Sequence, residues 1–293
     1  MDRALRILVG VDSESASERA VDWALREAQR QPSEITLLTA VDLLMSDPLD
    51  DEDFLERVRD RVRAAVPGLT VNTAVAEGSI PEVLKHYARR SDLLVIGSHR
   101  TRHWQAVLAG NLPLGMARAL TCPIVIVPDD WTPRQGSVTV GLDDDASSDA
   151  ALRRAGEFAR RGGGDLRIVH AWVRPPAPSD PVSLYLGDRS DPQGAHRQRL
   201  ERARRRLERR QPGLTIHEHL YEGAAFAGLL HLSDQAELIV IGSHRRGPLA
   251  GLILGSVARQ LLHFSKIPVC VVPPKRDVAH APWGHASRLE AAT

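Results

Sequence analysis

The stretch between Gly242 and Ser256 carries the residues best suited to bind an anion. It reads GSHRRGPLAGLILGS, so glycines recur where backbone amides must approach a ligand closely. A helix that begins at Gly255-Ser256 would present unpaired amide groups and the positive end of its dipole, and both favour phosphate. An alternative stays open on these residues alone, namely that the glycines close a tight turn and Ser256 caps the helix.

The same kind of segment occurs earlier in the chain because the sequence is duplicated. Residues 7–12 (ILVGVD) match residues 138–143 (VTVGLD), and residues 93–100 (LLVIGSHR) match residues 238–245 (LIVIGSHR). The offset between the copies changes from 131 to 145 residues, which indicates a 14-residue insertion in the second copy, around residues 175–194. That stretch is rich in Pro, Asp and Ser and predicts a long loop. The chain is therefore a tandem repeat.

Each copy consists of short apolar runs separated by segments with helical spacing. The apolar runs of the first copy predict strands at residues 7–11, 35–41, 70–76, 93–96 and 124–127. Apolar runs without alternation, separated by helices, indicate a parallel sheet covered on both faces. We predict an α/β fold of two tandem doubly wound five-stranded domains, at residues 1–130 and 137–274, with a linker at 131–136 and a flexible tail at 275–293.

Ligands of doubly wound sheets bind beyond the carboxyl ends of the strands, near the place where the strand order reverses. Three features of each copy converge on that edge: an Asp after the first strand, the end of the second strand, and the loop after the fourth strand. In the first copy these are Asp12, Ala40-Val41 and the loop from Gly97. In the second copy they are Asp143, Ala171-Trp172 and the loop from Gly242.

These motifs resemble the universal stress protein family. The resemblance rests on the Asp after the first strand, the VIGS junction and a Gly-x2-Gly-x9-Gly-Ser/Thr loop, and it covers both copies. It implies an adenine-nucleotide α-hydrolase-like fold in which the last strands, PIVIVP (123–128) and PVCVVP (268–273), pair across the copies. The product of that pairing is an internal pseudo-dimer, and further homodimerisation stays open. Many members of the family bind ATP, whereas others lack the loop and do not.

Both copies depart from the family loop. The second glycine of the pattern is Arg100 in the first copy and Arg245 in the second, and Asn111 stands where Ser or Thr is expected. The first copy also has Arg102 where the second keeps Gly247. A guanidinium can donate to phosphate, so Arg245 does not exclude binding. We expect the second loop to be the better site and one ATP per chain.

The resemblance places Asp143 and Trp172 near the adenosine. It places a second set of residues around the phosphates: Gly242, Arg245, Gly247, Gly255 and Ser256. Weaker counterparts in the first copy are Asp12, Val41, Gly97, Arg100, Gly110 and Asn111. The expected cofactor is ATP, and Mg²⁺ stays open because the run of residues 143–145 (DDD) is equally explained as the acidic start of a helix.

The implied function is a nucleotide-dependent stress-response regulator that acts through an unidentified protein partner. The sequence has no Ser/His/Asp arrangement, no paired carboxylates at a recognisable spacing and no Walker-type Gly-Lys-Ser, so no catalytic residue is assigned. Two alternatives stay open. One is a nucleotide-free interaction or structural protein with degenerate loops, and the other is a slow ATP hydrolase.

Composition narrows the class of partner. The 38 Lys and Arg residues against 37 Asp and Glu leave a net charge of +1, which argues against attraction of the whole protein to nucleic acid. Residues 196–210 hold eight Arg, but their apolar residues share one face and predict a packed surface helix, with binding of RNA or of an acidic partner as the alternative.

No apolar run is long enough for a membrane span, and Cys122 and Cys270 lack metal-ligand spacing. We expect a cytoplasmic protein.

Overall fold

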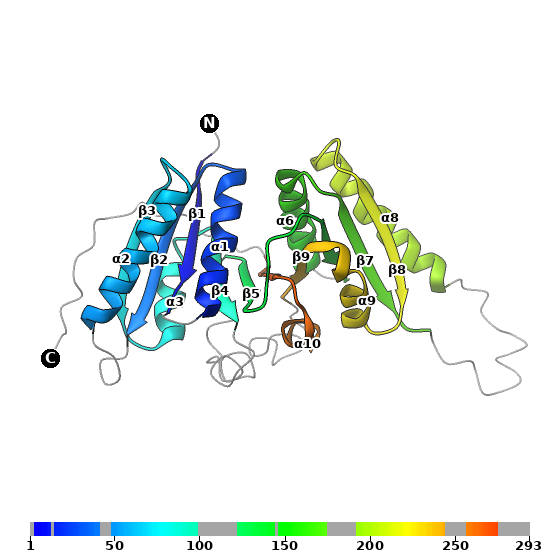
Figure 1. Cartoon of the computed structure of the whole chain (residues 1–293). Helices are drawn as coiled ribbons and strands as arrows, with labels where there is room; N and C mark the ends of the chain where they lie inside the picture. Colours follow the sequence, from blue (N-terminus) through cyan, green and yellow to red (C-terminus); the bar gives the residue numbers. More distant parts are fainter. Residues whose placement is uncertain are drawn as a thin grey trace, which may run out of the picture.

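The structure is a computed structural model that describes residues 3–12, 15–41, 48–98, 122–143, 146–174, 192–243 and 256–274. Strands and helices alternate in both copies (Figure 1). The first copy contains β1 (Leu5–Gly10), α1 (Ser15–Arg30), β2 (Ser33–Val41), α2 (Pro48–Ala65), β3 (Thr70–Glu77), α3 (Ile80–Ala88), β4 (Leu93–Ser98) and β5 (Ile124–Pro128). All five strands predicted for this copy are present. The helix expected after β4 lies outside the described residues.

The second copy repeats this order. It contains β6 (Ser137–Gly141), α6 (Ala146–Gly162), β7 (Leu166–Trp172), α8 (Pro192–Arg210), β8 (Ile216–Glu222), α9 (Ala225–His231), the 3-10 turn η2 (Ser233–Gln235), β9 (Ala236–Gly242), α10 (Ser256–Phe264) and β10 (Val269–Val272). Residues 192–194, predicted as the end of a loop at 175–194, belong instead to the first turn of α8, and the rest of that stretch lies outside the described residues. Proline is tolerated there, since the first amides of a helix have no partner within the helix.

The ten strands form one continuous sheet in the order β3-β2-β1-β4-β5-β10-β9-β6-β7-β8. Strands within each copy are parallel, and the antiparallel pair is β5 with β10, where Val125 lies opposite Cys270. The predicted pseudo-dimer is therefore confirmed, with the two last strands covering each other's edge (Figure 1). In each copy the first strand lies between the second and the fourth, which is where the strand order reverses.

Helices cover both faces of the sheet, as the unbroken apolar strands require. The buried residues of α1, α2, α6 and α8 belong to one core, and those of α3, α9 and α10 belong to the other. Side chains alternate between these cores along each strand: Ile168 of β7 lies in the first core and Val169 in the second. On α8 the predicted stripe of Leu200, Ala203 and Leu207 is buried against the sheet.

Matching Glu-Gly turns end β3 and β8. Gly78 and Gly223 have φ angles of 130° and 139°, which residues with a side chain rarely adopt. The backbone conformation therefore favours glycine at this position in both copies. The Gly223 amide donates to the Trp172 carbonyl (2.9 Å) and holds the end of β7 beside the end of β8.

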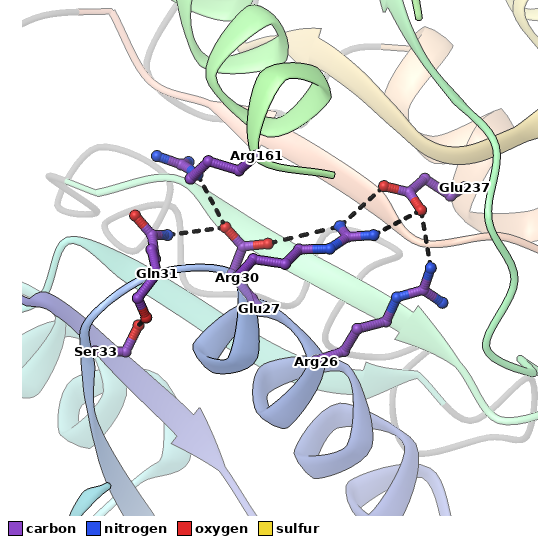
Figure 2. Close-up of polar contacts among 7 residues, drawn as sticks. All are labelled: Arg26, Glu27, Arg30, Gln31, Ser33, Arg161 and Glu237. Atoms are coloured by element: carbon purple, nitrogen blue, oxygen red, sulfur yellow. Dashed lines mark hydrogen bonds and ion pairs between the residues drawn. The ribbon is translucent and has the colours of Figure 1, made fainter. Parts of the chain in front are cut away.

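A buried polar cluster joins the two copies (Figure 2). Glu237 of β9 accepts two hydrogen bonds from Arg30 (2.9 Å each) and one from Arg26 (3.1 Å), both on α1 of the other copy. Glu27, which is 1% exposed, pairs with Arg161 of α6 at 3.3 Å. Burial raises the pKa of Glu27, and the positive charge of Arg161 acts against that rise.

Apolar contact accompanies these ion pairs. The rings of Trp23 on α1 and Phe158 on α6 meet edge to face with centroids 6.0 Å apart. Trp131, between β5 and β6, is 2% exposed, so the segment predicted as a linker contributes a side chain to the core. The two copies thus pack through side chains as well as through the sheet.

Candidate functional site

A cavity of about 300 Å³ opens at the carboxyl edge of the second copy. It lies at the ends of β6, β7 and β9 and against the first turns of α9 and α10. Because β6 pairs with β7 on one side and with β9 on the other, the cavity lies where the strand order reverses. This is the position at which open α/β sheets bind their ligands.

The walls of the cavity are mostly apolar and carry a few polar groups. The apolar part consists of Leu142, Val169, Ala171, Ala225, Leu229, Ile241, Val257 and Ala258. The polar side chains are Asp143, Ser148 and Ser256. Apolar walls with a few placed polar groups are typical of small-molecule pockets, and the volume is near the lower end of their usual range of about 300–1,000 Å³.

Asp143 is held at the mouth of this cavity by its own backbone. The Asp143 amide donates to Ser148 Oγ (2.9 Å) on α6, and the Leu142 amide donates to the Val169 carbonyl (2.8 Å), which extends the pairing of β6 with β7. The same arrangement recurs in the first copy, where the Asp12 amide donates to Ser17 Oγ (2.9 Å). The aspartate predicted from the sequence thus has a fixed backbone position in both copies.

Gly141 keeps the floor of the cavity open. A Cβ built at this position would lie 3.4 Å from Leu229 Cδ1 and 3.5 Å from Ile241 Cγ2. Any longer side chain would therefore enter the cavity between these two residues.

The start of α10 forms the rim opposite Asp143. Ser256 is its first residue and is exposed, and Val257 and Ala258 of the same turn also line the cavity. The first amides of a helix point out of its N-terminus without partners in the helix, so this rim suits an anion. Gly242, at the end of β9, lies beside it.

The structure brings Asp143, Gly242 and Ser256 to one cavity, but it directs Trp172 elsewhere. The Trp172 ring is 6% exposed and packs beside His196 of α8 with centroids 5.3 Å apart, on the other face of the sheet. Val169 and Ala171 are the residues of β7 that line the cavity, because side chains alternate along a strand. A small residue recurs at the matching position of the first copy, Ala40, and this repeat was the available signal for Ala171.

Several predicted residues lie outside the described part of the chain. In the second copy these are Arg245, Gly247 and Gly255, and in the first copy they are Arg100, Gly110 and Asn111. Asp12 and Gly97 lie at the ends of β1 and β4, and the backbone of Val41 ends β2, at the matching edge of the first copy. The assignment of these residues to a ligand stays a prediction.

Neither cysteine offers nucleophilic chemistry at this edge. Burial raises the pKa of the Cys122 and Cys270 thiols to about 12, so both remain protonated at neutral pH. Among the described residues, no group of three or more His, Cys, Asp or Glu side chains is placed to hold a metal ion.

The sequence comparisons with known proteins agree on one family. The sequence model described as the universal stress protein family matches residues 4–128 and, separately, residues 136–273. A universal stress protein of Mycolicibacterium smegmatis is 29% identical over 297 residues, covering 92% of this chain and 97% of the relative. A universal stress protein of Mycobacterium tuberculosis is 29% identical over 293 residues, covering 92% of this chain and 96% of the relative.

A solved structure has the same fold. It is a universal stress protein from Archaeoglobus fulgidus, with a TM-score of 0.69 at 20% identity, covering 92% of this chain and 98% of the other. None of the helices that the structure describes is both long and apolar enough to cross a membrane.

Proposed function

The chain belongs to the universal stress protein family, and from this premise we propose that its second copy binds ATP in the cavity at the ends of β6, β7 and β9. The observation that carries the proposal is the joint placement of apolar walls, Asp143 and the first turn of α10 around one opening. Each of these features suits a different part of an adenine nucleotide.

The apolar walls suit the adenine ring and the sugar. Leu142, Val169 and Ile241 present aliphatic carbon to the cavity, and burial of an aromatic base against such surface is favourable. The Asp143 carboxylate supplies hydrogen-bond acceptors for hydroxyl or amino groups of the nucleoside.

The rim of α10 suits the phosphates. Its first amides and the Ser256 hydroxyl are donors, and the positive end of the helix dipole attracts the negative charge. The loop residues Arg245, Gly247 and Gly255 are proposed to complete this part of the site. Because no metal-ligating cluster occurs among the described residues, we propose no protein ligand for Mg²⁺.

We propose that nucleotide occupancy regulates binding of a protein partner and that turnover is absent or slow. The proposal of slow turnover rests on the sequence, which has no Walker-type Gly-Lys-Ser and no Ser/His/Asp arrangement. ATP is thus assigned a signalling role.

Isothermal titration calorimetry with ATP tests the site. The variant Ala171→Trp places an indole in the cavity, and Ala40→Trp places one at the matching position of the first copy. We expect the wild type and Ala40→Trp to bind one ATP per chain, and Ala171→Trp to lose binding because its ring occupies the space of the nucleoside. Circular dichroism melts check that both variants fold.

Two outcomes would contradict the proposal. Loss of binding in Ala40→Trp with retention in Ala171→Trp would place the nucleotide in the first copy. An absence of heat in the wild type, together with native mass spectra free of adenine nucleotide, would favour the nucleotide-free interaction protein.

A further inference from the structure

A second hollow lies on the other face of the second copy, beside α8. Its volume is about 450 Å³, and its lining includes Leu142, Asp143 and His170 from the ends of β6 and β7. The rest of the lining, which we call the arginine groove, consists of Arg199, Arg202, Arg205, Arg206 and Arg209. Because His170 and Val169 point to opposite faces of β7, this groove is separate from the cavity proposed for ATP.

The arginines form a row along one side of α8. Arg199, Arg202, Arg206 and Arg209 follow one another at steps of three or four residues, which places neighbours on the same side of a helix. At a rise of 1.5 Å per residue the row extends over about 15 Å. A row of this length can contact several anionic groups of one ligand.

The first copy provides an internal comparison, because α2 occupies the position of α8. Both helices bury the same stripe against the sheet: Leu55 and Val62 of α2 match Leu200 and Leu207 of α8. Their charges differ in sign. α2 has four Arg against six Asp and Glu, a net charge of −2, whereas α8 has eight Arg against two Glu, a net charge of +6.

Packing on the sheet therefore does not require the arginines of α8. Three of the five groove arginines, Arg199, Arg205 and Arg209, stand where the first copy has other residue types. Those residues of α2 are Phe54, Asp60 and Ala64. The matching hollow of the first copy is smaller, about 190 Å³, and is lined partly by Phe54. The positive groove thus distinguishes the second copy from the first.

Two of the groove arginines have an exposed carboxylate partner among the described residues. Arg206 pairs with Asp149 of α6 (3.2 Å), Arg205 pairs with Glu201 (2.6 Å), and Arg202 Nε donates to the Gln198 carbonyl (3.2 Å). Within the described lining of the groove, Asp143 is the one acidic side chain beside five arginines. Both ion pairs are exposed, so a ligand can replace the carboxylates at little cost.

The chemistry of the lining selects the ligand. Guanidinium groups bind phosphate through paired N–H donors, more specifically than an ammonium group does. The described lining exposes no aromatic ring on which nucleic-acid bases could stack, because His170 is 4% exposed. Leu142 is the one apolar side chain in that described lining, so the groove offers little of the apolar surface that forms the core of protein–protein interfaces.

We propose that the arginine groove binds a chain of phosphates. Free inorganic oligophosphate and the polyphosphate tail of a nucleotide share this chemistry. The second copy would then bind two ligands: the proposed ATP in the cavity on one face of β6 and β7, and a chain of phosphates in the arginine groove on the other face. This inference does not depend on the ATP site, since the two hollows share only Leu142 and Asp143.

Calorimetry with sodium tripolyphosphate tests the proposal on the full chain. The test variant is Arg199→Gln/Arg202→Gln on α8, and the matched control is Arg57→Gln/Arg61→Gln on α2. We expect the wild type and the control to bind equally, and the α8 variant to bind at least about tenfold more weakly, because it lacks two charge-assisted donors. Equal affinity of all three proteins would overturn the proposal.

Further titrations distinguish the source of the phosphates and the class of ligand. Tripolyphosphate binding that persists in saturating ATP indicates free oligophosphate. If ATP abolishes tripolyphosphate binding both in the wild type and in Ala171→Trp, the groove binds the polyphosphate tail of a nucleotide. Both results support a phosphate site. A poly-glutamate peptide or a single-stranded RNA that binds as tightly, with the same dependence on α8, would contradict it.

Discussion

Replacing Glu237 by glutamine should loosen the junction between the two copies. The Glu237 side chain is 9% exposed and receives three hydrogen bonds from two arginines of the other copy (Figure 2). Glutamine has nearly the same shape, but it carries no charge and has one acceptor oxygen in place of two. Glu237→Gln therefore leaves Arg26 and Arg30 without their nearest carboxylate, and Arg30 keeps only the longer pair with Glu27 (3.9 Å).

The size of the effect follows from the charged hydrogen bonds that the substitution removes. Hydrogen bonds to charged groups contribute about 1.5–3 kcal/mol each, and removal of one partner of a buried ion pair costs about 3–5 kcal/mol. Burial lowers the pKa of Arg26, and the negative charges of Glu237 and Glu27 oppose that shift, so the variant leaves only Glu27 to offset the cost of burying this guanidinium. Since the arginines keep some contact with water, we expect a decrease of about 3 kcal/mol in the free energy of unfolding.

Thermal unfolding followed by circular dichroism measures this decrease. At about 2–4 °C per kcal/mol for chains of this size, Glu237→Gln should lower Tm by about 6–12 °C. The matched control is Glu222→Gln, which removes a carboxylate from an exposed pair with Arg174 and should leave Tm unchanged. Equal Tm values for the two variants would refute the reasoning, because the buried cluster would then contribute no more than a surface pair.

Two further predictions concern titrating groups. Burial disfavours the charged form of Asp92, but hydrogen bonds from Arg6 outweigh this effect and lower the pKa of the carboxyl group. The Asp92 carboxylate therefore stabilises the fold at any pH above its unfolded pKa. This contribution disappears as the pH falls through the folded pKa. Asp92→Asn should therefore lower the free energy of unfolding by about 1–3 kcal/mol at pH 7, as measured by urea denaturation. The difference from wild type should shrink below about pH 4, where the carboxylate becomes protonated. A difference that does not change with pH would show that the carboxylate charge is not its cause. Because burial raises the pKa of Cys122 and Cys270 to about 12, neither thiol should react with a disulfide reagent at pH 8 until urea unfolds the chain, and rapid labelling of the native protein would contradict their burial.

The repeated sequence predicted most of the architecture because its signals are local. Continuous apolar runs such as residues 93–96 indicated strands buried on both faces, and Leu93 to Ile96 are at most 3% exposed. The spacing of Leu200, Ala203 and Leu207 indicated the buried side of α8. These patterns involve residues two to four positions apart in the chain. The regular geometry of strands and helices determines which of these residues share a face, so the sequence alone predicts it.

The candidate site was predicted less completely. The Asp after the first strand and the small residues around α10 follow from the chain order of a doubly wound domain, and Asp143, Gly242 and Ser256 do share one cavity. The contribution of β7 was harder to predict, since Ala171 and Trp172 are adjacent. A pattern of alternation shows that they face opposite sides, but only the placement of α8, α9 and α10 decides which side has the cavity.

By itself the sequence determined that this protein is a duplicated α/β chain, and it predicted a ligand edge in each copy. It did not determine that the charged side chains of Glu27 and Glu237 would be buried between the copies. Arg30 and Glu237 are 207 residues apart in the chain, and their pairing depends on how α1, α6 and β9 meet after β5 joins β10. The tertiary structure decided these contacts because desolvation and ion pairing act through space, whereas periodicity describes only neighbours along the chain.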